Sequence, residues 1–332
     1  MGSLVSDALV QVGVKLYREE ALEAFEVAGG RVKAVATEKR TLPADIVILG
    51  LGVRPNTDLA ARAGIPLGVR GALRVNDRMQ TEVPGIWAAG DCAESFHLVS
   101  RRPVHIALGT IANKQGRVAG INLGGGYATF PGVVGTAVSK ICKWEVARTG
   151  LQEHEIRALG LEHVSATIES TTRAGYYPHA GPITVKTLAE KGSGRLLGAQ
   201  IVGIEGAAKR IDIFATALHA GMSVQDMINL DLSYAPPYSN AWDPVHIAVR
   251  QAASSASSSA PPRSSARRSV SVAENRQLRI CPSAVSRVRL HAPQNDSETE
   301  AMMPTVLWLP STRHSCAGAD PRGDGSGCRS KY

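Results

Sequence analysis

The chain has 332 residues, of which 44% are hydrophobic, so it is long enough for two ordinary domains with buried cores. It contains no long apolar run of the kind that crosses a membrane, and its first residues lack the basic and apolar stretches of a signal peptide. The net charge of +8 comes mainly from residues 253–332, which hold 11 basic and 6 acidic side chains, so residues 1–252 give no reason to expect a nucleic-acid partner.

Five cysteines are spread along the chain without a CxxC pair, and no group of cysteines and histidines has the spacing of a zinc site. We therefore expect no bound metal and a reducing, cytoplasmic setting. Cys92 and Cys142 lie where the sequence is regularly patterned, but neither has a neighbour with which to form a dithiol. Both are interpreted as small structural residues.

The N-terminal part shows helix, strand and hairpin patterns in turn. Residues 4–11 predict the end of a helix and residues 12–17 a strand. In residues 24–37 apolar residues alternate on both sides of Gly29-Gly30, a two-residue turn signal that predicts a β-hairpin. Residues 44–52 form a continuous apolar run that ends in glycines, which is typical of a buried parallel strand that reaches a binding crevice.

The next part of the chain contains short elements and one longer helix. Residues 64–83 give short strand signals and turns. Residues 85–91 predict another buried strand, which ends in the acidic Asp91. A helix is predicted from Thr110 to Leu123, with Thr110 as its N-cap.

From about residue 130 the pattern changes to mixed strands and helices, which predicts a second domain of the α+β type. Strands are predicted at 135–141, 163–170, 183–190 and 196–203, and helices at 152–159 and about 206–221.

After Arg250 the composition changes sharply, because residues 251–269 are almost entirely Ser, Ala, Pro and Arg. The remainder has no sustained periodicity, so it cannot bury enough apolar surface to offset the entropy of ordering. We predict that 252–332 is disordered. The apolar patch at 302–310 is too short to fold alone.

Residues 81–94 carry the strongest motif, T-E-V-P-G-I-W-A-A-G-D-C-A-E. The predicted strand delivers Asp91 at its carboxyl end, where ligands bind in open α/β sheets, and Gly90 lets the backbone approach a ligand closely. The simpler alternative is a buried strand that ends in a turn acid. The motif resembles the second FAD motif of flavoproteins that have two dinucleotide-binding folds. The resemblance implies FAD contacts from Thr81, Pro84, Gly85, Ile86, Trp87, Ala88, Ala89, Gly90 and Asp91.

Residues 44–57 precede this motif and end their apolar run with Gly50 and Gly52. The segment resembles the crossover from the nicotinamide domain to the FAD domain in pyridine nucleotide–disulfide oxidoreductases. A strand that ends in GxG is weak alone, but its distance upstream of the Gly-Asp motif fits the family. The resemblance implies that Gly50 and Gly52 lie near bound NADH or NADPH; which of the two remains open.

Residues 108–117 resemble the helix of the same family whose N-terminus points at the flavin. Free amides and the positive end of a helix dipole would favour an anionic flavin there. The resemblance implies contacts from Thr110, Ala112 and Asn113. The alternative is an ordinary amphipathic helix capped by threonine.

Residues 127–251 resemble the dimerisation domain of the family, and the resemblance implies a homodimer. The sequence SYAPPYS around Tyr234 stands where some members carry a His-Pro pair, and it is similar to the CoA-disulfide reductase and NADH oxidase branch. The resemblance implies catalytic roles for Tyr234, Tyr176 and Tyr177, of which the alternative is aromatic packing at a dimer interface. It also implies that Asn113, Trp242 and Arg250 lie near a CoA-type substrate.

The expected fold class is α/β: a partial Rossmann-like region with two dinucleotide-binding folds, then an α+β dimerisation domain and a disordered tail. The expected boundaries are 1–57 for a remnant of the NAD(P)H-binding domain, 58–126 for the C-terminal part of the FAD-binding domain, 127–251 for the dimerisation domain and 252–332 for the tail.

The resemblance implies an FAD-dependent NAD(P)H oxidoreductase that acts on a disulfide, persulfide, peroxide or oxygen. The family also carries two GxGxxG loops and a redox cysteine, and none of these is present in the sequence. The activity of this chain alone is therefore uncertain. The alternative is a non-catalytic fragment that serves as a dimerisation module with a partial flavin site.

Overall fold

The computed structural model describes residues 1–257. The predicted tail beyond residue 257 and the apolar patch at 302–310 lie outside the described residues. The described beginning of the predicted tail is helical, because α7 (Pro244–Ser257) continues past the expected boundary at residue 251. Ala252 and Ala256 are fully buried, so this last turn belongs to the folded domain.

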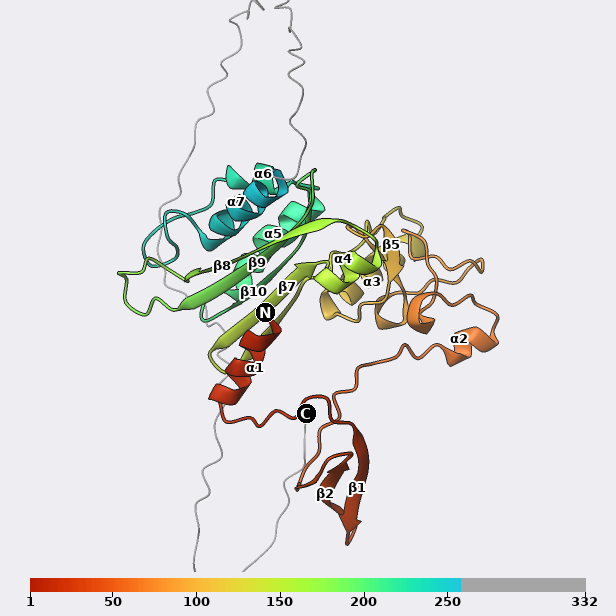
Figure 1. Ribbon diagram of the computed structural model, residues 1–332. Helices are drawn as coiled ribbons and strands as arrows, with labels where there is room; N and C mark the ends of the chain where they lie inside the picture. Colours follow the sequence, from red (N-terminus) through yellow and green to blue (C-terminus); the bar gives the residue numbers. More distant parts are fainter. Residues whose placement is uncertain (258–332) are drawn as a thin grey trace, which may run out of the picture. The chain divides into compact units, whose positions relative to one another are not determined.

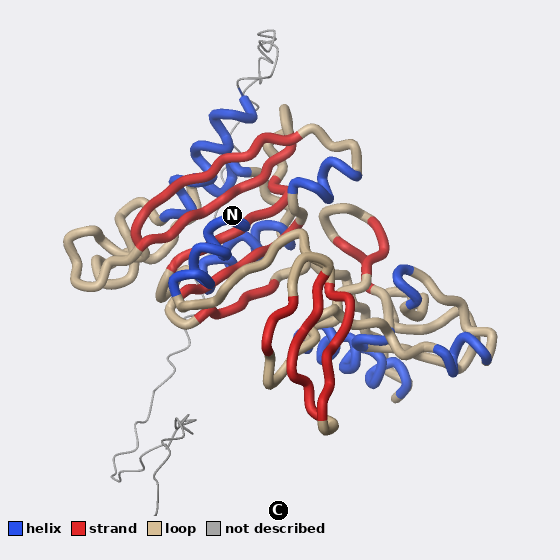
Figure 2. The backbone as a smooth tube through the Cα atoms, turned by 60° about the horizontal axis from the view of Figure 1, so that its bottom comes forward, coloured by secondary structure: helices blue, strands red, loops and turns tan. Residues whose placement is uncertain are grey.

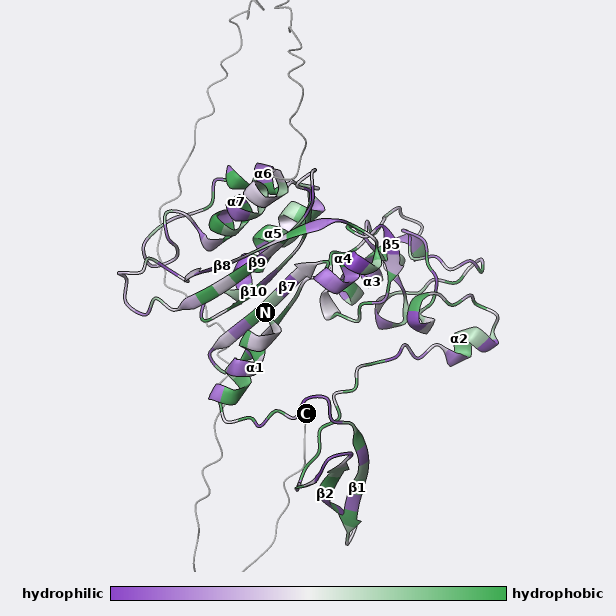
Figure 3. Ribbon diagram, viewed as in Figure 1, coloured by the Kyte–Doolittle hydropathy of each residue, from purple (hydrophilic) through white to green (hydrophobic). Residues whose placement is uncertain are grey.

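The N-terminal residues form the helix α1 (Gly2–Gln11) and a small antiparallel sheet of β1 (Leu22–Ala28), β2 (Arg31–Thr37) and β3 (Thr41–Pro43), in the order β1-β2-β3. Gly29 and Gly30 connect β1 to β2, and both have positive φ angles, which a two-residue hairpin turn requires. The predicted hairpin is confirmed. Every residue of β1 is exposed, although hydrophobic residues recur along it (Figure 3).

The strands predicted at 12–17 and 44–52 are absent, and both predictions are wrong for the described structure. Residues 44–52 form an irregular segment in which Ile46 and Ile48 are 81% and 90% exposed. A parallel strand exists only through hydrogen bonds to neighbouring strands. No strand of residues 1–257 pairs with this segment, so its apolar residues have nothing to pack against.

The middle of the chain is built from short elements: α2 (Asp58–Arg62), two 3-10 turns (Val69–Gly71 and Gly90–Cys92), β4 (Ser95–His97), β5 (Arg102–Val104) and α3 (Gly109–Leu123). The strand predicted at 85–91 is extended chain with one isolated bridge, from Trp87 to Gln80, and it ends in the 3-10 turn. Two small apolar clusters hold these elements together, one of them centred on Met79, Ile111 and Phe130.

The second part contains a five-stranded antiparallel sheet, whose strands are among those drawn in red in Figure 2. The order of the strands is β6-β7-β10-β9-β8. Its strands are β6 (Ala137–Ile141), β7 (Trp144–Gly150), β8 (His163–Thr171), β9 (Pro182–Glu190) and β10 (Leu196–Gly203). Its helices are α4 (Glu153–Ala158), α5 (Ile211–His219), α6 (Val224–Ile228) and α7, with a 3-10 turn (Ala208–Arg210) before α5. The strands and helices predicted in this part are confirmed, whereas β7, α6 and α7 were not predicted.

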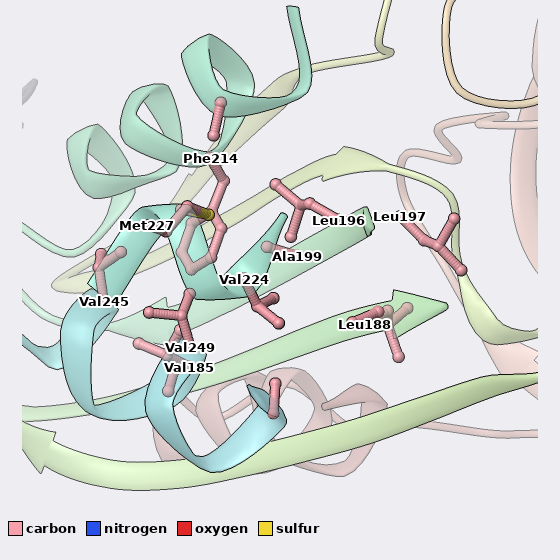
Figure 4. Close-up of a cluster of buried hydrophobic side chains, with 14 of the residues drawn as sticks. Val185, Leu188, Leu196, Leu197, Ala199, Phe214, Val224, Met227, Val245 and Val249 are labelled. Atoms are coloured by element: carbon pink, nitrogen blue, oxygen red, sulfur yellow. The ribbon is translucent and has the colours of Figure 1, made fainter. Parts of the chain in front are cut away.

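The core of this second part lies between the sheet and the helices α5, α6 and α7, which pack on the same face (Figure 1). Figure 4 shows side chains of β9, β10 and the three helices pointing toward one another. Among them Val185, Phe214 and Val249 are completely buried. The domain therefore supplies its own hydrophobic core. None of the helices in residues 1–257 has the length and apolar character that crossing a membrane requires.

Candidate functional site

The first half of the 81–94 motif forms a tight turn. The hydroxyl of Thr81 accepts a hydrogen bond from the amide of Val83 (3.2 Å) and donates to the carbonyl of Ile86 (3.0 Å). The amide of Ile86 donates to the carbonyl of Val83 (3.2 Å) across Pro84-Gly85, and Gly85 has a φ angle of 81°. These are the marks of a type II turn. Thr81, Pro84 and Gly85 therefore shape the backbone.

The next residues anchor the motif in the apolar core. Ala88 is buried and its amide donates to the carbonyl of Met79 (3.1 Å). Trp87 and Ala89 pack against the cluster around Met79 and Ile111. The Nε1 of Trp87 is buried and has no hydrogen-bond partner in the described residues.

Gly90 and Asp91 lie directly beside α3. Gly90 has a φ angle of 79°, and a Cβ atom added to it would lie 3.3 Å from the Cβ of Ala112, so only glycine fits without a shift. His105 Nε2 is hydrogen-bonded to the carbonyl oxygen of Asp91 (2.8 Å). The Asp91 carboxylate is exposed and makes no hydrogen bond or ion pair within residues 1–257. It is free to bind a ligand.

The completely buried side chain of Gln115 joins this motif to α3, a role that the sequence reasoning missed. Its Oε1 accepts from the amide of Gly90 (2.8 Å), and its Nε2 donates to Ser95 Oγ (2.9 Å) and the carbonyl of Glu94 (3.3 Å). A signal was present, because Gln115 is a polar residue four positions after Ile111 on the apolar face of the helix. His105 was missed because it looked like one of several scattered histidines.

The N-terminus of α3 differs in detail from the prediction. Leu108 is the N-cap, and Thr110 is exposed and caps nothing, so its predicted capping role is wrong. The amides of Ile111 and Ala112 both donate to the carbonyl of Leu108, whereas those of Gly109 and Thr110 precede these first helical bonds. The exposed Asn113 donates through Nδ2 to the carbonyl of Gly109 (2.8 Å).

Taken together, these positions fit part of a flavin. The exposed Asp91, the side-chain-free Gly90 and the positive end of α3 lie together, which suits a hydroxyl-bearing chain and a ring edge that takes up negative charge. Gly50 and Gly52 are not brought to this place by any contact. Both are exposed, and an added Cβ at either would meet nothing within 4 Å.

The predicted tyrosines lie on two loops of the second domain. The neighbouring hydroxyl of Tyr234 raises the pKa of Tyr176 above its ordinary value. Both side chains are exposed, and the amide of Ala174 joins the two loops by donating to the carbonyl of Pro236 (3.1 Å). The backbone of Tyr177 takes part in a turn within its own loop. No contact joins these tyrosines to Asp91 within the described part of the chain.

Two of the three predicted substrate residues are neighbours. The guanidinium of Arg250 lies over the ring of Trp242, 4.5 Å from its centre, and His246 packs edge-on against the same ring. Asn113 makes no contact with them. Cys92 is half-buried and Cys142 is exposed, and both are free thiols. Residues 1–257 contain no group of side chains suited to a metal ion.

Comparison with known families gives two matches that follow each other along the chain. The family described as pyridine nucleotide-disulphide oxidoreductase matches residues 1–116. The dimerisation domain of the same family matches residues 136–245.

Individual relatives agree with this assignment. The NAD(P)H coenzyme A polysulfide/persulfide reductase of Pyrococcus horikoshii is 41% identical over 220 residues, which are 66% of this chain and 49% of that protein. The NADH oxidase of Methanocaldococcus jannaschii is 36% identical over 252 residues, which are 76% of this chain and 56% of that protein. The chain thus spans about half the length of the curated relatives it matches.

A solved structure shares the fold. The NAD-dependent persulfide reductase from A. fulgidus superimposes with a TM-score of 0.73 at 40% identity, covering 75% of this chain and 46% of that one. The two family matches, the identities and the shared fold agree. This chain belongs to the pyridine nucleotide-disulphide oxidoreductase family.

Proposed function

We propose that the chain forms part of an FAD-dependent NAD(P)H oxidoreductase that acts on a CoA disulfide, a persulfide or a related sulfur or oxygen acceptor. The observation that carries the proposal is the meeting of Asp91, Gly90 and the first amides of α3. The names of the relatives support the choice of acceptor, since they include a CoA polysulfide/persulfide reductase and an NADH oxidase.

Each group at this place has a definite task in holding a flavin. The exposed Asp91 carboxylate accepts hydrogen bonds from sugar-like hydroxyls, and Gly90 leaves room for them next to the backbone. The Gly109 and Thr110 amides, at the positive end of α3, stabilise negative charge on the ring. Gln115 of α3 accepts from the Gly90 amide, and His105, which precedes α3, binds the Asp91 carbonyl, so both hold the backbone of this turn in place. Hydride transfer from NAD(P)H and electron transfer to the acceptor are the chemistry that a bound flavin would supply.

The remaining predicted site residues belong to the same proposal in other roles. The exposed Tyr176–Tyr234 pair can donate a phenolic proton in a hydrogen bond to a thiolate or a carbonyl. The match to a dimerisation domain supports a homodimer, in which the tyrosines of one subunit serve the site of the other. Gly50 and Gly52 are proposed to face the nicotinamide, and Trp242 and Arg250 a CoA-type substrate.

A second candidate is a dimerisation module with a partial flavin site and no turnover. It is favoured by the absence of any GxGxxG loop in the 332 residues, because such a loop binds the pyrophosphate of a dinucleotide. The exposed apolar residues of 44–52 agree with it. The two candidates differ in whether the chain gains flavin and activity when the rest of the family fold is supplied.

The experiment compares the purified chain with and without a polypeptide that covers the part of the Pyrococcus horikoshii reductase outside the match. Flavin absorbance and NAD(P)H oxidation with CoA disulfide are measured in both. We expect little flavin and no turnover for the chain alone. When the chain and the added polypeptide are combined, we expect bound flavin and turnover. Asp91→Ala is expected to lower flavin content of the combined sample at least about 10-fold, the equivalent of one lost charged hydrogen bond.

Asp58→Ala, which removes an exposed carboxylate at the start of α2, is the matched control and is expected to leave flavin content unchanged. Equal flavin content in the Asp91→Ala and control samples would contradict the proposed site. A combined sample that is dimeric by sedimentation but lacks flavin would favour the second candidate.

A further inference from the structure

The two loops that carry Tyr176 and Tyr234 run side by side in opposite directions. Contacts join them in sequence: Asn240 Nδ2 donates to Thr171 Oγ1 (3.2 Å), and the amide of Ala174 donates to the carbonyl of Pro236 (3.1 Å). Tyr176 and Tyr234 lie two residues further along these loops, next after Ala174 and Pro236. The separation of the two tyrosines therefore depends on how the preceding contacts hold the loops.

At one point between these contacts, the two loops cannot bond to each other directly. Between the Asn240 and Ala174 contacts, the carbonyl oxygens of Thr172 and Tyr238 are both directed at the Nη2 atom of Arg210, at 2.7 and 2.8 Å. Two carbonyl oxygens are both acceptors and cannot bond to each other. A donor with two hydrogens must stand between them, and Arg210 supplies it.

Arg210 is itself fixed from every side. Its Nε donates to Asp243 Oδ2 (2.9 Å) and its Nη1 to the carbonyl of Gly206 (2.8 Å), while only 8% of the residue is exposed. Asp243 also accepts from Ser239 Oγ (2.7 Å) and from the amide of Val245 (2.9 Å) at the start of α7. The guanidinium is thus held by a buried ion pair that is anchored to a helix.

We propose that Arg210, held by Asp243, is a positioning residue that holds together the loops carrying Tyr176 and Tyr234 and so sets the separation of the two tyrosines. Its catalytic importance rests on the proposed function, but its geometric effect does not. Lysine cannot replace it, since an ammonium has no planar fork with which to reach Asp243 and two carbonyls together. Removing the guanidinium leaves two acceptors facing each other, so the loops separate at the tyrosine end.

The test is the titration of individual tyrosines by NMR in the full chain with 13C-labelled Tyr, assigned with Tyr176→Phe and Tyr234→Phe. In the unmodified chain we expect Tyr176 to titrate above the ordinary value of about 10, and Tyr234→Phe to return it to that value. Arg210→Lys is expected to do the same. Lys209→Arg, the reverse exchange at the exposed neighbour, is expected to have no effect.

Because Arg210 is buried, the folding of Arg210→Lys is checked first through the amide protection of β9 and β10. Ser239→Ala is the milder second variant, since it weakens the hold on Asp243 without removing a buried charge. It is expected to shift the Tyr176 titration in the same direction by a smaller amount. An unchanged Tyr176 titration in folded Arg210→Lys overturns the proposal, and Ser239→Ala decides the question in the same way if Arg210→Lys does not fold. No flavin is involved, so this outcome is separate from that of the proposed function.

Discussion

The five-stranded domain and the first 57 residues both contain strand-like apolar sequences, yet only the domain buries them. In the domain, Val185 and Ile201 of adjacent strands are fully covered by helices. In the N-terminal part, Ile48 and Leu51 are 90% and 83% exposed, and every residue of β1 is exposed. The comparison teaches that an apolar run is buried only where the same chain also supplies the strands and helices that cover it.

The largest difference is expected from the same substitution in the two regions. Phe214 is completely buried beneath the sheet, so Phe214→Ala should lower the free energy of unfolding by about 3–5 kcal/mol. Phe25 lies on the exposed β1 opposite Val35, so Phe25→Ala should cost about 0.2–1 kcal/mol. Urea unfolding followed by circular dichroism measures both. Equal losses in the free energy of unfolding for the two variants would show that β1 is buried in solution.

The middle region, which contains the proposed flavin edge, is expected to show an intermediate effect. Gln115→Leu leaves the amide of Gly90 and the hydroxyl of Ser95 without their partner, which should cost about 1–3 kcal/mol. The exposed Arg117→Leu on the same helix is the control and should change stability by less than about 0.5 kcal/mol. Thermal unfolding compares the two, and a Gln115→Leu variant as stable as the control would refute the anchoring role.

A smaller, pH-dependent effect should come from His97, which is buried where β4 meets the second domain. Burial lowers the pKa of His97, an effect that Glu155 opposes and Arg148 reinforces. Below the unfolded-state pKa of about 6.5 the unfolded chain takes up a proton that the folded chain does not. The free energy of unfolding should therefore fall as the pH is lowered from about 6.5 toward the folded-state pKa.

His97→Gln should flatten this dependence in urea unfolding measured across that pH range. His219 has its pKa lowered in the same direction, so its contribution remains as a background in the variant. A slope that is as steep in His97→Gln as in the unmodified chain would assign the pH dependence to other groups.

The sequence could predict those elements whose signals are local. The Gly29-Gly30 turn determined the hairpin, and alternating apolar residues determined β8 and β9, because each pattern meets its partner within the chain. The strand predicted at 44–52 does not form, because no strand of residues 1–257 pairs with this segment. β7 was missed because Glu145 and Arg148 interrupt the apolar pattern of its sequence, WEVARTG, while its pairing with β6 and β10 is visible only in the fold.

The candidate site was predicted only where a residue type carries the chemistry. Asp91 and Gly90 stand out because a carboxylate and a glycine follow an apolar run. Gln115 and Arg210 could not be identified in this way, since each acts by joining segments that are far apart in sequence. Their partners become visible only when the fold is known.

Amide hydrogen exchange on the full chain tests the central comparison most directly. We predict strong protection in β9 and β10, whose amides are paired and buried, and near-unprotected exchange in residues 45–56, which have no strand partner within the described chain. Adding the complementary part of the Pyrococcus horikoshii reductase should then protect residues 45–56 without changing β9 and β10. Strong protection of residues 45–56 in the chain alone would contradict the account.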